Sequence, residues 1–162
     1  MAYTPPTPDD HDLVEAATRA IEARYKVGHH QIAAALRGGD GTVSLGVHLE
    51  ASVGRASICA EAVALGGAVT AGLSDFETIV AVRHPAPTEA GGTIRVVPPC
   101  GLCRELLLDY APDLHALLPA ADGQVVRVRL TDLLPEKYVG TKWRTLSAHR
   151  DAGRRARDDV AL

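Results

Sequence analysis

Apolar residues recur at three- and four-residue steps between Leu13 and Ile21, and this period predicts an amphipathic helix with one buried face. The preceding stretch Thr7-Pro8-Asp9-Asp10 has the features of a helix start, with Thr7 as N-cap, proline at the first helical position and acids in the first turn. The apolar stripe ends near Tyr25 and Gly28. We therefore expect a first helix that begins directly after Thr7.

Shorter apolar runs, bounded by glycine, proline and polar residues, predict strands along the rest of the chain. The first two runs flank the glycine-rich residues 38–41 and are expected to form a hairpin. The expected strands are residues 29–36, 42–50, 78–82, 93–97, 114–118 and 125–129.

Three further helices are expected between and after these strands. The resulting order, α-β-β-α-β-β-α-β-β-α, predicts one mixed sheet with helices packed on its faces, because such a sheet buries all the apolar runs at once. The expected helices run from Cys59 to about Ala71, from the opening residue Cys100 to Tyr110, and from Asp132 toward Tyr138.

Composition indicates one domain that acts on a small molecule. The chain has 162 residues, 46% of them hydrophobic, which suits a single globular domain with its own core. We expect residues 1–138 to form this domain and residues 139–162, with six Lys or Arg and three Asp, to form a solvated terminal helix or a subunit contact. The formal net charge of −3 argues against nucleic acid as a partner.

The cysteine count indicates a reducing compartment. Three cysteines are an odd set for a disulfide framework, and thiolate metal ligands persist best where thiols stay reduced. The first residues lack a basic cluster followed by an apolar run, and no segment is apolar over the length of a bilayer. We therefore expect a cytoplasmic protein with no membrane partner.

The candidate chemistry centres on three thiols. Cys100 and Cys103 are three positions apart at the mouth of an expected helix, and Cys59 opens another. A structural zinc site fills four protein positions, whereas a catalytic one uses three and leaves the fourth for water or substrate, so three cysteines favour a catalytic zinc site. A redox pair remains an alternative, as does a structural site with a fourth ligand from His29, His30, His48, His84 or His115.

Glu61 and Arg104 are the expected helpers of such a metal. Glu61 lies two residues after Cys59 and could take a proton from metal-activated water and deliver it to a substrate, which is general acid/base chemistry. Three thiolates would leave zinc with a net negative charge. Two helix N-termini and Arg104, directly after Cys103, could offset that charge.

These residues carry a family resemblance. Cys59-Ala60-Glu61, followed by Pro99-Cys100-Gly101-Leu102-Cys103-Arg104, resembles the zinc-dependent cytidine deaminase superfamily, whose signature pairs [HC]-x-E with P-C-x-x-C. Cysteine in the first motif resembles the small tetrameric nucleoside deaminases. The runs 79–85, 94–97, 103–106 and 109–113 are similar to bacterial blasticidin S deaminases, and the similarity covers residues 9–138.

The resemblance implies a three-layer α/β fold with a mixed five-stranded sheet flanked by helices. It also implies one zinc ion per subunit, held by Cys59, Cys100 and Cys103, with Glu61 moving the proton while the 4-amino group of a cytosine nucleoside leaves as ammonia. The expected substrate is blasticidin S or a cytidine- or deoxycytidine-type nucleoside, and the expected assembly is a homotetramer. The alternatives are deamination of another amino-heterocycle and a non-catalytic structural-zinc module.

The resemblance also indicates where the substrate would bind. Ordinary cytidine deaminases place an Asn-x-Glu pair on the ribose, and Glu50, nine residues before Cys59, matches that Glu, whereas His48 replaces the Asn. Ala62 stands where tetrameric relatives often have an arginine that balances the thiolate charge. Tyr138 and Trp143 lie where relatives bring a C-terminal aromatic over the active site; the alternative for Trp143 is simple surface packing.

Overall fold

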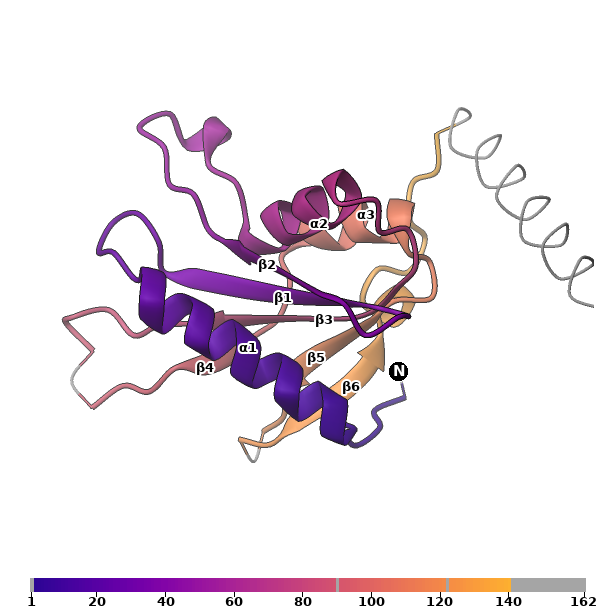
Figure 1. Cartoon of the computed structure of the whole chain (residues 1–162), viewed down its shortest axis with the longest axis horizontal. Helices are drawn as coiled ribbons and strands as arrows, with labels where there is room; N and C mark the ends of the chain where they lie inside the picture. The colour runs from indigo at the N-terminus through magenta and orange to yellow at the C-terminus, as the bar shows by residue number, and fades with distance from the viewer. Residues whose placement is uncertain (1, 90, 122, 141–162) are drawn as a thin grey trace, which may run out of the picture.

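A computed structural model of the chain describes residues 2–89, 91–121 and 123–140, so Trp143 and most of the basic tail lie outside the described residues. One mixed sheet separates α1 on one face from α2 and α3, which lie side by side on the other (Figure 1). In chain order the elements are α1 (Pro8–Arg24), β1 (Ile32–Gly38), β2 (Val43–Val47), the 3-10 turn η1 (Gly54–Ala56), α2 (Ala60–Thr70), β3 (Phe76–Arg83), β4 (Arg95–Val97), α3 (Gly101–Tyr110), β5 (His115–Pro119), β6 (Val125–Arg129) and the 3-10 turn η2 (Leu130–Leu133).

The sheet has the order β2-β1-β3-β5-β6, and β4 pairs with β3 beside the end of β5. All neighbours are antiparallel except β3 and β5, which are parallel, with Thr78 opposite His115. The expected mixed sheet with helices on both faces is therefore confirmed. It has the six strands that the apolar runs predict rather than the five that the resemblance implies, and the run expected at residues 93–97 forms the three-residue strand β4.

The period of two along the central strands divides the core into two clusters. Ala33 and Ala35 of β1 pack with Leu13, Ala17 and Ile21 of α1. This is the stripe that the helical period predicts, and each of its three members is buried.

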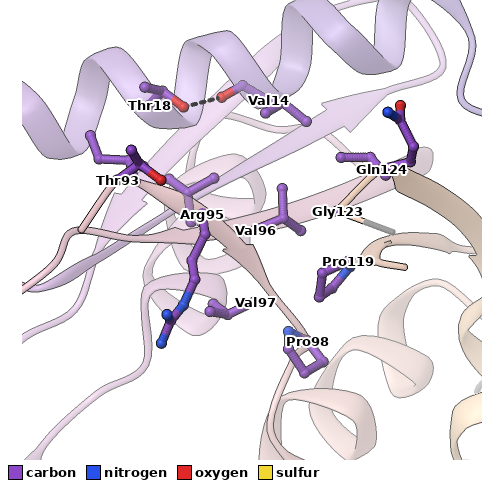
Figure 2. Close-up of a pocket in the computed structure, with 13 residues that line it drawn as sticks. Val14, Thr18, Thr93, Arg95, Val96, Val97, Pro98, Pro119, Gly123 and Gln124 are labelled. Carbon is purple, nitrogen blue, oxygen red and sulfur yellow. Dashed lines mark hydrogen bonds between the residues drawn. The ribbon is translucent and has the colours of Figure 1, made fainter. Parts of the chain in front are cut away.

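A groove of about 700 Å³ opens on this α1 face, between α1, β4 and the turn from β5 to β6 (Figure 2). Val82 and Val96 line it and also belong to the α1-side core. The Thr18 hydroxyl at its rim donates to the Val14 carbonyl oxygen at 2.9 Å, so this polar group is already satisfied.

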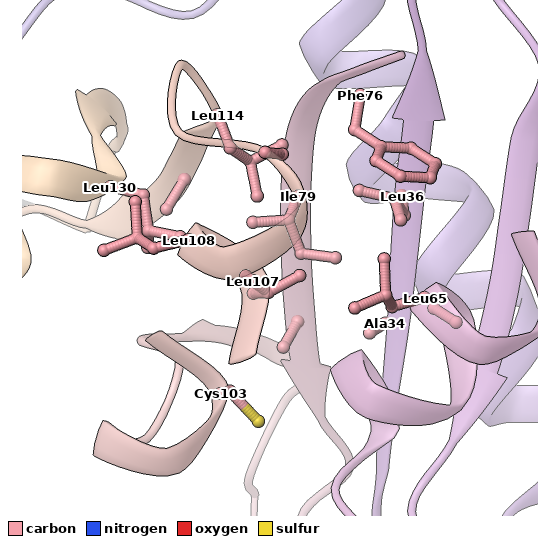
Figure 3. Close-up of a cluster of buried hydrophobic side chains, with 14 of the residues drawn as sticks. Ala34, Leu36, Leu65, Phe76, Ile79, Cys103, Leu107, Leu108, Leu114 and Leu130 are labelled. Atoms are coloured by element: carbon pink, nitrogen blue, oxygen red, sulfur yellow. The ribbon is translucent and has the colours of Figure 1, made fainter. Parts of the chain in front are cut away.

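The other face of the sheet carries the larger core cluster (Figure 3). Ala34 and Leu36 of β1 and Ile79 of β3 meet Leu65 of α2 and Leu107 of α3 there. The Cys103 side chain belongs to the same cluster and is 2% exposed. The cysteine motifs therefore lie on the α2–α3 face, and the sheet separates them from the groove.

Several expected boundaries are corrected. Cys59 and Cys100 are the N-caps of α2 and α3 rather than residues of the first turns. The strand expected from residue 29 begins at Ile32, because residues 26–30 form a turn in which Gly28 adopts a φ of 73°. Among the described residues, no helix is both long and apolar enough to cross a membrane.

The helix expected from Asp132 toward Tyr138 is wrong. A 3-10 turn, η2, ends at Leu133, and the chain then continues without regular structure to Gly140 apart from isolated turns. Pro135 explains the difference, since a proline disfavours helical backbone at the residue before it, and Leu134 has φ −145° and ψ 71°.

Asp10 joins the start of α1 to the sheet. The Thr7 side chain and Asp10 form the reciprocal capping box of α1. The fully buried Asp10 carboxylate also accepts hydrogen bonds from Arg37 at 3.1 Å and from Arg127 at 3.0 and 3.2 Å. Burial alone would raise the pKa of Asp10, but the hydrogen bonds from Thr7 and Arg127 outweigh burial and hold that pKa below its usual range.

Replacing this carboxylate should destabilise the fold. Asp10→Asn removes the anion that Arg37 and Arg127 share and leaves Arg37 only its 3.6 Å ion pair with Glu77. We expect a loss of about 3 kcal/mol in the free energy of unfolding, measured by urea denaturation at neutral pH. The wild type should also lose this contribution as the pH falls below about 4, since a depressed carboxyl pKa stabilises the folded state only above the unfolded pKa.

The matched control is Glu15→Gln, because Glu15 forms an exposed pair with Arg19 at 3.1 Å, with both side chains more than half exposed (65% and 64%). Its effect should stay below about 0.5 kcal/mol. Equal stability of Asp10→Asn and Glu15→Gln would contradict the assigned role of the buried carboxylate.

Candidate active site

The close packing of α2 against β2 determines where Cys59 lies. Gly46 of β2 lies so close to the first turns of α2 that a Cβ atom there would collide with the Ala60 carbonyl oxygen and the Ala64 backbone. The Ser44 hydroxyl donates to the Ala64 carbonyl oxygen at 2.8 Å on the same side. Because Cys59 directly precedes this packed helix, the contact with β2 fixes where its sulfur lies.

Cys100 and Cys103 come from the start of α3, after β4 and two prolines. Cys100 caps the helix, and Cys103 follows within the first turn. The Sγ atoms of Cys59, Cys100 and Cys103 all lie within 4.8 Å of one another, and those of Cys59 and Cys100 are 3.7 Å apart. The structure thus brings together the three thiols that the sequence singles out.

This arrangement fits a metal ion better than a disulfide. A disulfide requires about 2.05 Å between sulfur atoms, and all three cysteines are free. Tetrahedral zinc with bonds of about 2.3 Å to sulfur separates its ligands by about 3.8 Å, close to the 3.7 Å between Cys59 and Cys100. In the described part of the chain, no fourth His, Cys, Asp or Glu joins the three thiols, so none of the five candidate histidines completes a structural site.

The electrostatics of the cluster call for a cation. Burial raises the pKa of the Cys103 thiol, and the nearby Glu61, Cys100 and Cys59 raise it further. Burial and the neighbouring Cys100 likewise raise the pKa of Cys59. Cys59 and Cys103 therefore resist ionising, whereas a divalent cation would reverse that preference by binding their thiolates. Both helix N-termini also direct their positive ends at this point.

Glu61 is the buried carboxyl beside the three thiols. Its side chain points from the first turn of α2 and is 5% exposed. Burial raises the pKa of the Glu61 carboxyl, while hydrogen bonds from its own backbone N–H and from the Cys103 thiol partly offset that rise. A buried carboxyl with a raised pKa beside the thiols is a candidate for moving a proton.

His48 and Glu50 lie together beside the cluster. The His48 Nε2 atom is 3.5 Å from the Glu50 Oε2 atom. The Coulombic interaction with His48 acts to lower the pKa of the Glu61 carboxyl. The Nδ1 atom of His48 is buried with no hydrogen-bond partner among the described residues. Glu50 is 45% exposed at its side chain and accepts a hydrogen bond from the Ser57 hydroxyl at 2.8 Å.

His30 and Ser57 support His48 and Glu50, a role that the sequence pattern does not predict for either residue. The His30 Nδ1–H donates to the His48 carbonyl oxygen at 2.8 Å, and the Ser57 hydroxyl holds Glu50 and also accepts from the Ala51 N–H at 3.1 Å. Neither forms part of a spaced motif. Only the register that sets residues 26–30 beside residues 48–50 reveals them.

The remaining candidates lie farther out. Arg104 donates through Nε to the Pro99 carbonyl oxygen at 2.8 Å and through Nη1 to the Leu133 carbonyl oxygen at 3.0 Å, so its charge is held at the start of α3. Tyr138 is 79% exposed and makes little contact with the rest of the described chain. The structure brings Cys59, Cys100, Cys103, Glu61, His48 and Glu50 together, but not Tyr138.

Comparison with known proteins identifies the family. The model of the cytidine and deoxycytidylate deaminase zinc-binding region matches residues 7–114. The chain belongs to this deaminase family. Blasticidin-S deaminase from Bacillus cereus is 48% identical over 129 residues, which are 80% of this chain and 91% of the relative. Cytidine deaminase from Halalkalibacterium halodurans is 33% identical over 78% of this chain and 91% of that protein.

Solved structures of the deaminase family have the same fold. The crystal structure of cytidine deaminase from Burkholderia pseudomallei matches with a TM-score of 0.63 and 31% identity, over 79% of this chain and 98% of that one. The chain is therefore a hydrolase that acts on C–N bonds, and zinc is its cofactor.

Zinc content tests the deaminase site directly. Protein purified with zinc present should carry one zinc ion per chain by metal analysis, and Cys103→Ser should lose it, because a neutral hydroxyl replaces a buried thiolate ligand. Adding zinc at about 100 times its dissociation constant to the metal-free chain should raise the free energy of unfolding by about 2.7 kcal/mol.

Ser57→Ala is the control, since it changes a neighbouring hydroxyl that is no ligand, and it should keep full zinc. Zinc-free wild-type protein under these conditions, or full zinc in Cys103→Ser, would contradict the three-thiol site.

Proposed function

We propose that this protein hydrolyses the 4-amino group of a cytosine nucleoside and releases ammonia. The observation that carries the proposal is a buried carboxyl with a raised pKa, Glu61, beside three convergent thiols at two helix N-termini. Deamination needs a metal with an open position and one group that moves protons, and in this proposal the three thiols hold the metal while Glu61 moves the protons.

In this proposal Cys59, Cys100 and Cys103 hold the zinc. Zinc on the three thiolates supplies the Lewis acidity that prepares water for attack on the ring carbon that carries the amino group. The Glu61 carboxylate accepts a proton from the attacking water and passes it to the adjacent ring nitrogen. The hydroxyl that has added to the ring carbon then gives its own proton, through the same carboxyl, to the amino group. The C–N bond breaks, the ring carbon becomes a carbonyl and the nitrogen leaves as ammonia.

Arg104 is proposed to balance the charge of the thiolates. Its guanidinium is fixed in the first turn of α3 by the Pro99 and Leu133 carbonyl oxygens, next to Cys103. Ala62 cannot supply a charge of its own, and the N-termini of α2 and α3 add their positive ends. Together these groups would keep the zinc electrophilic despite three thiolates.

Blasticidin S is the proposed substrate, ahead of cytidine or deoxycytidine. The support is the 48% identity to blasticidin-S deaminase, against 33% to a cytidine deaminase. His48, with its unpartnered buried Nδ1, and the partly exposed Glu50 are proposed to bind the part of the substrate that replaces ribose. Tyr138 and Trp143 are proposed to cover its extended portion. The three thiols also favour the reducing cytoplasm as the place of action.

A substrate panel tests the proposal. Ammonia release should be measured with blasticidin S, cytidine, deoxycytidine and free cytosine, and kcat/KM should be highest for blasticidin S. Glu61→Gln should lose about 10²- to 10⁴-fold in kcat while keeping its zinc, because only the proton carrier is removed.

Glu15→Gln, on the exposed surface of α1, serves as the control and should leave kcat unchanged. Full activity of zinc-loaded Glu61→Gln would refute the mechanism. If the enzyme prefers an amino-heterocycle that is not a pyrimidine nucleoside, deamination of that heterocycle would replace the proposed reaction.

A homotetramer is the proposed assembly. The outward face of α2 has no charged side chain and includes the exposed Gly66 and Gly67 and the 44% exposed Val69. Leu45, on the adjacent β2, is 49% exposed. Charge is usual on a solvated helix face, and glycine in the middle of a helix costs stability, so this uncharged face favours contact with further copies of the chain.

Light scattering tests this assembly. The wild type should have about four times the 17.1 kDa mass of one chain, and Val69→Glu should lower that mass, because it would bury an unpaired charge in the interface. Tyr3→Glu, at a similarly exposed apolar residue near the N-terminus, is the control and should not change the mass. A wild-type monomer would contradict the proposal.

A further inference from the structure

The segment after η2 is held against α3 by two cations. Arg104 donates to the Leu133 carbonyl oxygen at 3.0 Å, at the beginning of this segment. Lys137, near its end, lies 2.8 Å from the Glu105 carboxylate and 2.9 Å from that of Asp109. Because Arg104 and Glu105 directly follow Cys103 in the chain, residues 133–138 are fixed to the helix that carries two of the three thiols.

The Lys137 ammonium uses its full set of donors. Besides the two carboxylates, it donates to the Tyr138 carbonyl oxygen at 3.0 Å, and its side chain is only 15% exposed. Glu105 and Asp109 stand four residues apart on one face of α3, where two like charges repel unless a cation lies between them. The contact is therefore stronger and more specific than a single exposed ion pair.

The residue before Lys137 has a backbone conformation that is unusual for a residue other than glycine. Among the described residues, Glu136 alone has a positive φ without being glycine, at 55°. A non-glycine residue keeps that conformation only where its surroundings enforce it. The turn at Glu136 directs Lys137 toward α3, and the Lys137 contacts with α3 are what hold the turn.

We propose that Lys137 is a positioning residue, which clamps residues 133–138 to the helix that carries Cys103 through Glu105 and Asp109, and so orients the segment whose Tyr138 is proposed to cover the substrate. This inference rests on the proposed function, because it concerns how that substrate is bound. Lys137 touches no reacting atom. Its loss should therefore change substrate binding rather than the chemical step.

Steady-state kinetics with the best substrate of the panel test the clamp. Lys137→Met keeps the length of the side chain but removes its charge, and we expect KM to rise about tenfold with kcat within about twofold of the wild type. Lys137→Arg should restore KM, since a guanidinium can bridge both carboxylates. Zinc content should not change in either variant.

Two further variants isolate the effect. Arg19→Met removes a cation from the exposed pair with Glu15 and should leave KM unchanged. Glu105→Gln removes one acceptor of the clamp and should raise KM in the same way but by less, which keeps the test available if Lys137→Met does not fold. An unchanged KM in Lys137→Met would overturn the proposal. A fall in kcat that accompanies the rise in KM, with neither restored by Lys137→Arg, would also overturn it.

Chymotrypsin cleavage after Tyr138 separates this inference from the proposed function. Lys137→Met should be cut there several-fold faster than the wild type, as identified by mass spectrometry, because the clamp no longer restrains the segment. A wild type that deaminates nothing would refute the proposed function, whatever the cleavage rates. Equal cleavage rates would refute the clamp in an enzyme of any activity.

Discussion

At Gly46 the backbone of β2 lies directly against the first turns of α2, and the position of the whole site depends on that contact. A side chain at residue 46 would push α2 away from the sheet, since Ala60 and Ala64 already occupy the space. Cys59 and Glu61 stand at the end of α2 nearest this contact. A shift of α2 would therefore move one thiol and the proton carrier together, away from the two thiols of α3.

The two sides of the sheet handle buried charge in opposite ways. On the α1 side, the Asp10 carboxylate is satisfied by Thr7, Arg37 and Arg127, and these hydrogen bonds outweigh the cost of burying its charge. On the other side, Glu61 and Cys103 are buried and have raised pKa values, and the thiolate form of Cys103 depends on a cation. Ionising these buried groups therefore costs free energy, and binding of a metal cation offsets that cost.

Spacing in the sequence predicts the helices and their caps, but it does not predict the hydrogen bonds between side chains that are far apart in the chain. The capping box at Thr7, the stripe of α1 and the two cysteine motifs all follow from spacing within a few residues, and the structure confirms the helices at these places. The bonds from Arg37 and Arg127 to Asp10 join residues 27 and 117 positions apart, for which no periodic signal exists. The helix expected from Asp132 does not form, because Pro135 disfavours helical backbone at Leu134.

The groups proposed for the chemical step and the groups proposed for substrate specificity lie in different kinds of structure. The groups proposed for chemistry lie at helix N-termini, whose packing against the sheet leaves them little freedom. The groups proposed for the rest of the substrate lie on connecting segments: His48 and Glu50 after β2, held by His30 and Ser57, and Tyr138 after η2. Loops can change their side chains without disturbing the core. A fold built this way can exchange one nucleoside for another while the thiols and Glu61 stay in place, and this is the physical reason that the motifs identify the reaction more firmly than the substrate.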